Sequence, residues 1–169
     1  MVGKTHRSIV EMILFGMLAA LTFALQVVMS PLPNIEPVSL LVMLFAVTFG
    51  WKALYPVYIF VVMEILYYGF NIWNIYYLYV WAILAVATLL LRKHQSALVF
   101  AILAAVFGLL FGALCAIVDV CIGGVGYAAA KWVSGIPFDV THCVGNFAIA
   151  LVAFTPLRKL MQKLYRKIQ

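Results

Sequence analysis

The sequence predicts an all-α integral membrane protein with six transmembrane helices that form a single membrane domain over residues 1–169. Of its 169 residues, 67% are hydrophobic and only 9% are charged, whereas a soluble domain is about half apolar and about a quarter charged. A soluble fold of this size cannot bury so much apolar surface, so lipid must solvate much of the chain. The apolar residues occur in long continuous runs, which indicate helices rather than the short alternating strands of a membrane barrel.

Six apolar runs, separated by prolines, glycines and charged residues, are the expected spans. They cover about 8–29, 38–49, 54–68, 75–91, 97–122 and 135–157. The proline-rich loop SPLPNIEP follows the first run, and the basic residues Arg92 and Lys93 follow the fourth. We expect the basic tail RKLMQKLYRKIQ to continue the last helix as an amphipathic end.

The stretch between the fifth and sixth runs is expected to be irregular. A glycine cluster at 123, 124 and 126 should end the fifth span. The next segment, YAAAKWV, is expected to form a short surface or re-entrant helix. Gly135 and Pro137 are then expected to open the sixth span, because proline suits the first turn of a helix.

The basic residues indicate the orientation of the chain. A cytoplasmic N-terminus places every Lys and Arg, from Lys4 and Arg7 to the tail, on the cytoplasmic side, with the single exception of Lys131. Lys and Arg concentrate in the cytoplasmic loops of membrane proteins, so the sequence predicts that both termini are cytoplasmic. The net charge of +6 therefore reflects topology, and we expect a lipid bilayer and no nucleic acid as partner.

Polar and aromatic residues gather in the predicted outer half of the spans, where buried polar groups are costly and mark candidate sites. A small-molecule pocket is mostly apolar with a few convergent polar groups, and this composition predicts one. The candidate substrate-binding residues are Asn34, Glu36, Glu64, Tyr67, Tyr68, Asn71, Trp73, Asn74, Tyr77, Asp119, Lys131, Trp132, Asp139, His142 and Asn146.

Three of these candidates share one face of the sixth helix. Asp139, His142 and Asn146 follow the spacing i, i+3, i+7. The structural alternatives are that Asp139 caps the helix, and that His142 and Asn146 bond neighbouring helices. The aromatic candidates are alternatively anchors at the membrane interface.

The remaining acidic candidates also have structural alternatives. Glu36 is alternatively a solvated loop charge, and Glu64 or Asp119 a partner of Lys131. Polar residues from four separate segments nevertheless gather at one membrane face. That pattern favours a pocket over a set of unrelated structural roles.

No motif in the sequence indicates catalysis or a metal centre. The chain has no nucleophile elbow, HExxH motif or phosphate loop, so we expect no catalytic residues and no cofactor. Asp139 and His142 are only two potential metal ligands, and the cysteines lack CxxC spacing. Without an ATP-binding motif the chain cannot pump alone and needs a partner or a coupling ion.

The first span carries a stripe of small residues. Gly16, Ala20 and Ala24 recur every four residues. Small residues at this spacing let another helix approach closely, so we expect a docking face for a partner. The alternative is ordinary packing within the chain.

These features together resemble the substrate-binding (S) components of energy-coupling factor (ECF) vitamin transporters over essentially the whole chain. The segments that carry the resemblance are AALTFA, LPNIEPVSLLVMLFAVTFG and SGIPFDVTHCVGNF. The resemblance implies a multi-pass protein of the bacterial cell membrane that captures a vitamin at the outer face, beneath the loop after the first span. It also implies that the small-residue stripe contacts a transmembrane coupling subunit joined to two ATPases, and that the chain topples to deliver its substrate.

Within this family, GIPFDVTHCVGN and the aromatic stretch look most like S components assigned to cobalamin (vitamin B12). The N-terminal Met-Val-Gly lacks the early histidine of nickel and cobalt components, which argues against a metal substrate. A queuosine precursor, pyridoxine, riboflavin, pantothenate and folate are the alternative substrates. Two other functions are also considered: a small membrane enzyme that uses Asp139 and His142, and a scaffold that works through the small-residue stripe.

Overall fold

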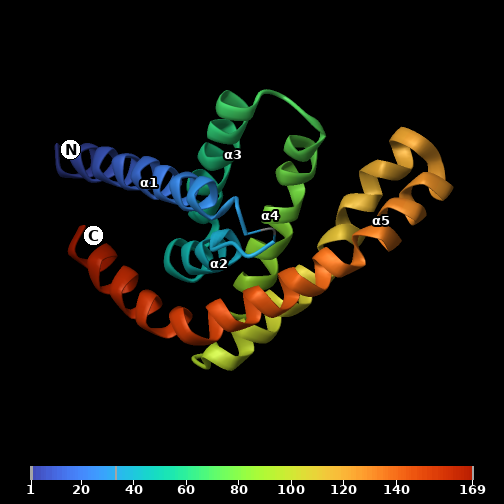
Figure 1. Cartoon of the computed structure of the whole chain (residues 1–169). Coiled ribbons are helices and arrows are strands. Elements are labelled where there is room, and N and C mark those ends of the chain that lie inside the picture. The colour runs from blue at the N-terminus through green and yellow to red at the C-terminus, as the bar shows by residue number, and fades with distance from the viewer. Residues whose placement is uncertain (1, 33, 169) are drawn as a thin grey trace.

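The computed structural model describes residues 2–32 and 34–168, with side chains from Ser8 onward, and all the regular secondary structure in that part of the chain is helical (Figure 1). The all-α prediction is confirmed. The side chains of Lys4 and Arg7, which the topology prediction uses, lie outside the described residues. The elements are α1 (Val2–Met29), α2 (Val38–Phe49), the 3-10 helix η1 (Gly50–Ala53), α3 (Leu54–Tyr68), α4 (Ile72–Leu91) and α5 (Ala97–Ile168).

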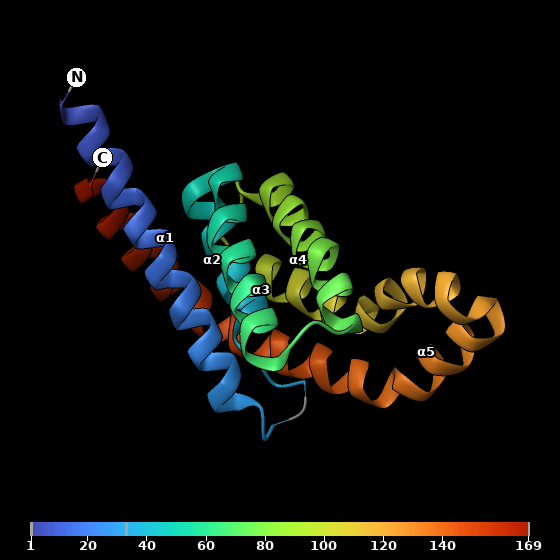
Figure 2. The ribbon, with the colours of Figure 1, turned by 90° about the horizontal axis from the view of Figure 1, so that it is seen from above.

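Helix α2 forms the centre of the bundle. Its sequence VSLLVMLFAVTF is apolar on all sides, which is typical of a buried helix, and all of its residues except Val47 and Thr48 are buried. It packs against α4 and α5, whereas α1 lies along the outside against α3 (Figure 2). A helix of 12 residues rises only about 18 Å, so α2 by itself is shorter than a hydrocarbon layer of about 30 Å.

Three glycines lie where the chain changes direction, each with a positive φ that other residues rarely adopt, and Gly69 is the one between α3 and α4. Gly50, with φ 64°, ends α2 and leads through η1 into α3. Gly124, with φ 78°, interrupts α5 and folds it into a hairpin. The two limbs of this hairpin, 97–123 and 125–168, run back along each other (Figure 1).

The second limb of α5 corrects the prediction for the stretch after the glycine cluster. YAAAKWV is not a separate helix but the beginning of this limb, and Gly135 and Pro137 lie inside the limb rather than at its start. The helix also continues beyond Leu157 to Ile168. A proline costs one backbone hydrogen bond and bends a helix without ending it where packing holds both sides in place. The long limb is visibly curved in Figure 1.

Four stretches are long and apolar enough to cross a membrane, which is compatible with a membrane protein. Large apolar side chains remain exposed on the outside of the bundle, among them Met17, Leu66, Leu90 and Val152, as a lipid-facing surface requires. The six-span count and the cytoplasmic termini remain predictions. The four stretches are Ser8–Met29, Val38–Tyr68, Ile72–Leu91 and Ala97–Ile168.

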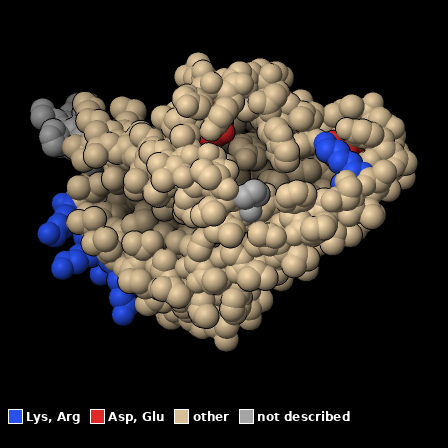
Figure 3. All heavy atoms as spheres, in the orientation of Figure 1, with Lys and Arg blue, Asp and Glu red and all other residues tan. Residues whose placement is uncertain are grey.

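The end of the bundle that holds the N-terminal part of α1 also holds the C-terminal part of α5. Lys52 Nζ lies 2.7 Å from Glu11 Oε2, and the Tyr165 hydroxyl donates to the same carboxylate. Arg158 Nη1 donates to the carbonyl of His94 at 2.8 Å and ties α5 to the end of α4. Figure 3 shows basic side chains over the C-terminal end of α5, apart from the hollow in which acidic atoms are visible.

Candidate ligand-binding site

A cavity of about 810 Å³ lies at the opposite end of the bundle, between the C-terminal end of α1, the loop 30–37, α3, α4 and both limbs of α5. Small-molecule sites typically have volumes of roughly 300–1,000 Å³. The structure brings most of the candidate residues together on the wall of this cavity. They are Asn34, Glu36, Glu64, Tyr68, Asn71, Trp73, Asn74, Tyr77, Asp119, Lys131, Trp132, Asp139 and His142.

Two candidates do not line the cavity. Tyr67 is exposed and packs edge-on against Phe23 and Tyr68. Asn146 is buried one turn beyond His142, where its Nδ2 donates to Ser39 Oγ at 3.1 Å and to the Ala104 carbonyl at 3.4 Å. For Asn146, the alternative of a bond between neighbouring helices is therefore confirmed.

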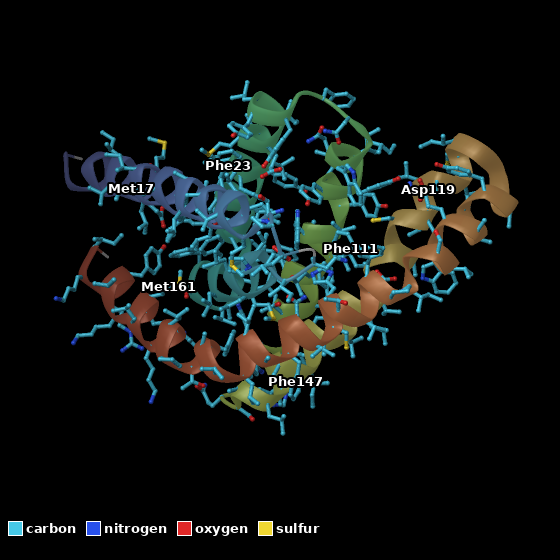
Figure 4. All side chains as sticks on the ribbon, in the orientation of Figure 1. Met17, Phe23, Phe111, Asp119, Phe147 and Met161 are labelled. Atoms are coloured by element: carbon cyan, nitrogen blue, oxygen red, sulfur yellow. The ribbon has the colours of Figure 1, made fainter. Side chains whose placement is uncertain are left out.

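Several wall residues are absent from the sequence-based set. On the first limb of α5, Phe111 and Cys115 precede Asp119 at intervals of four, so one helix face carries all three, and Figure 4 places Phe111 and Asp119 on this limb beside α4. This spacing could have identified both residues from Asp119 alone. The other omitted wall residues include Gln26 and Phe138, whereas Tyr76 and Trp81 belong to the aromatic stretch that the sequence places at the pocket.

One wall of the cavity is an ion pair between a buried Asp119 and a partly exposed Lys131, near the tip of the α5 hairpin. Lys131 Nζ lies 2.7 Å from Asp119 Oδ1 and 2.8 Å from the Tyr76 hydroxyl, and that hydroxyl donates to Asp119 Oδ1 at 2.5 Å. These contacts join both limbs of the hairpin to α4 across the turn at Gly124. Asp119 is therefore the partner of Lys131, and Glu64 is not.

The loop 30–37 is fixed to α2 and to the second limb of α5. Glu36 accepts hydrogen bonds from the backbone N–H of Val38 at 2.9 Å, from Ser39 Oγ at 3.2 Å and from His142 Nε2 at 3.2 Å. Asn34 Nδ2 donates to the carbonyl of Phe138 at 3.0 Å. Glu36 is thus a bonded group at the positive end of α2, and the alternative of a solvated loop charge is wrong.

Asp139 projects between the two limbs of α5. Its Oδ1 accepts from the backbone N–H of Gly112 at 3.1 Å, and a Cβ at Gly112 would stand only 2.5 Å from its Oδ2. One turn away, a Cβ at Gly108 would stand 2.8 Å from the carbonyl carbon of His142. These two glycines therefore permit the close approach that positions Asp139 and His142. Since the limb begins well before Asp139, the alternative of a helix cap is wrong.

Asn71 and Asn74 shape the rim of the cavity by starting α4. The Asn71 side chain accepts from the N–H of Trp73 at 2.9 Å, and Asn74 Oδ1 accepts from the N–H of Asn71 at 2.7 Å. This reciprocal arrangement is a capping box. It explains why α4 begins at Ile72 rather than near residue 75.

No family model, curated protein or solved structure matches this chain. Function is therefore inferred from the cavity and its residues. Among the side chains that the structure describes, in residues 8–32 and 34–168, no three from His, Cys, Asp or Glu are placed to hold a metal ion. His142 Nε2 bonds Glu36, and Asp139 Oδ1 bonds the backbone of Gly112. The cavity wall is thus a set of aromatic surfaces with a few polar groups, which suits recognition of a small molecule.

Proposed function

We propose that this chain is the substrate-binding subunit of an ATP-driven ECF-type importer, a six-span protein of the bacterial cell membrane with cytoplasmic termini. The observation that carries the proposal is the cavity of about 810 Å³, whose aromatic and polar wall comes from α1, the loop 30–37, α3, α4 and α5. It lies away from the basic C-terminal tail, as expected of a site that opens outward. A scaffold would not need such a cavity.

The loop after α1 supports capture of a substrate beneath it. Its residues Leu32, Asn34 and Glu36 contribute to the cavity wall, and its bonds to His142 and Phe138 hold it against α5. In this proposal the loop covers the bound micronutrient.

The small-residue stripe supports docking to a partner. A Cβ at Gly16 would have no neighbour within 4 Å, and Ala20 and Ala24 are exposed. These positions are therefore free to receive a helix of the transmembrane coupling subunit, which joins two ATPases. The ATPases would supply the energy for toppling, since this chain carries no nucleotide-binding motif.

Substitution of the stripe tests the docking. We expect the double variant Ala20→Leu, Ala24→Leu to keep its fold, because both positions are exposed, and to lose the ATPase subunits that co-purify with the tagged chain from native membranes. The matched control is Val152→Leu, on an exposed part of α5. Equal recovery of the ATPases with all three proteins would contradict the role of the stripe.

The substrate is proposed to be a vitamin or related micronutrient, with cobalamin as the first candidate. The test is isothermal titration of the purified full chain with cobalamin, a queuosine precursor, pyridoxine, riboflavin, pantothenate and folate. We expect saturable one-to-one binding of a single compound. Absence of binding across this panel would contradict the proposal, and turnover of a lipid by the chain alone would favour the enzyme alternative with Asp139 and His142.

A pair of exposed tryptophans provides a matched control for binding at the cavity. Trp132 lines the cavity and is 41% exposed, whereas Trp51 is exposed elsewhere. A ring contact is worth about 0.5–1.5 kcal/mol, so Trp132→Leu should weaken binding by about 2- to 12-fold. Trp51→Leu should leave the affinity unchanged, and an equal loss in both variants would place the ligand elsewhere.

A further inference from the structure

The cavity is acidic although the protein as a whole is basic. Every acidic residue of the sequence except Glu11 lines it, while Lys131 is the one Lys or Arg among its described wall residues. Lys131 is already bonded to Asp119, so it compensates that carboxylate. The charges of Glu36, Glu64 and Asp139 have no Lys or Arg partner among the described residues.

Buried hydrogen-bond acceptors on this wall lack donors. Glu64 Oε1, Asp139 Oδ2 and His142 Nδ1 have no hydrogen-bond partner within the described part of the chain. These residues are only 7%, 4% and 3% exposed, and buried polar atoms in folded proteins are almost always paired. An ionised carboxylate accepts hydrogen bonds only, so His142 donates to Glu36 through Nε2 and, in the neutral ring, presents Nδ1 as an acceptor.

The other unpaired polar atoms of the wall complete the pattern. Gln26 Oε1 is a further buried acceptor without a partner among the described residues, and Trp81 Nε1–H is a buried donor in the same situation. With His142 neutral, the wall residues thus hold four acceptors and one donor that lack a partner among the described residues. Tyr77, Trp81 and Phe111 supply aromatic surface between them.

We propose that the cavity selects a positively charged aromatic nitrogen compound, whose N–H groups donate to Glu64 and Asp139 while its ring packs against the aromatic wall; this inference rests on the proposed function. Leaving a carboxylate buried without a partner is costly, and a cationic ligand group removes that cost with charge-assisted hydrogen bonds. Cations also bind favourably over aromatic faces. A carboxylate or phosphate in the ligand would instead meet like charges and no free basic side chain, so this inference ranks an amine ahead of cobalamin, which carries a phosphate.

The test uses pairs of compounds that share a ring and differ in charge, titrated into the purified full chain. One pair is pyridoxamine and 4-pyridoxic acid, and the other is 7-aminomethyl-7-deazaguanine and 7-carboxy-7-deazaguanine. We expect at least one amine to bind, and to bind at least 10-fold more tightly than its acid partner. Glu64→Gln should reduce that preference about 10-fold, whereas Glu11→Gln, at the far end of α1, should keep it.

Each other outcome has a defined consequence. An acid that binds as tightly as its amine partner would overturn the inference. Binding of cyanocobalamin, riboflavin, pantothenate or folate when neither amine binds would also overturn the inference. The proposed function would still hold in that case. Binding of none of these compounds would contradict the proposed function and the inference together. If Glu64→Gln does not fold, the inference is tested by the preference of the unaltered protein for the amine over the acid within each pair of compounds.

Discussion

The close contact between the two limbs of α5 at Gly108 yields a prediction that can be quantified. A Cβ at this position would stand 2.8 Å from the carbonyl carbon of His142 and 2.9 Å from the backbone nitrogen of Cys143. Ordinary carbon contacts are about 3.5–4.0 Å, so Gly108→Ala must separate the limbs by on the order of 1 Å. Helix backbone cannot rotate away as a side chain can.

Two opposing effects determine how much Gly108→Ala changes the free energy of unfolding. Overpacking costs about 1–3 kcal/mol, and a contact with backbone belongs to the upper part of that range. Alanine recovers about 1 kcal/mol through its higher helix propensity. The expected net destabilisation of about 1–2 kcal/mol should lower the apparent melting temperature by about 3–6 °C.

Thermal unfolding in detergent, followed by circular dichroism, measures this difference. The matched control is Gly126→Ala, because a Cβ at Gly126 has no neighbour within 4 Å. That variant should be as stable as the unaltered protein or more stable by up to about 1 kcal/mol. If Gly108→Ala melts at or above the temperature of the unaltered protein, or if both variants lose the same stability, the contact at Gly108 is not as close as the structure indicates.

Three further predictions concern bonds that join separate helices. Lys131→Met leaves the buried Asp119 without its cation, and should lower the free energy of unfolding by about 1–3 kcal/mol. Breaking a fully buried ion pair costs about 3–5 kcal/mol, and the smaller value is expected here because Lys131 is partly exposed. Arg158→Met removes the donor to the carbonyl of His94 and should cost about 1–3 kcal/mol. Asn146→Leu removes two bonds and should lower the melting temperature without changing ligand affinity, because Asn146 does not line the cavity.

Surface substitutions of the same kind serve as controls for these three variants. Lys159→Met and Arg166→Met alter exposed residues, and exposed substitutions usually change stability by less than about 0.5 kcal/mol. Melting temperatures that fall equally in the controls and in Lys131→Met or Arg158→Met would show that the interhelical bonds contribute nothing specific. A loss of ligand affinity in Asn146→Leu would show that this residue does reach the ligand.

The helices could be predicted from the sequence because long apolar runs indicate membrane helices. Most of the cavity wall could be predicted because polar residues that interrupt such runs are costly in lipid and therefore mark candidate sites. Glu64, Asp119 and the pair Asp139 and His142 come from three separate segments, and the structure places all four residues on the cavity wall. Their gathering was foreseeable since each is a costly polar group within an apolar run. Phe111 and Cys115 are absent from the predicted set because an apolar residue within an apolar run does not stand out as a candidate. Only their spacing from Asp119, at intervals of four residues, indicates that they face the cavity.

The errors arise where tertiary packing overrides local residue preferences. Gly135 and Pro137 favour a helix start, yet the second limb of α5 continues through them because its packing against the first limb compensates for one lost hydrogen bond. Only Gly124 among the nearby glycines leaves the helical region. The partner of Lys131 also depends on the hairpin, which brings Asp119 rather than Glu64 within reach.

The central claim is that the cavity holds one small molecule as cargo. Native mass spectrometry of the full chain, released from its own membranes in mild detergent, tests this claim most directly. We expect a single bound compound of micronutrient size at one per chain, lost or reduced in Trp132→Leu and retained in Trp51→Leu. A chain that carries only lipid, in membranes from cells supplied with all candidate micronutrients, would show that the cavity does not hold such a compound.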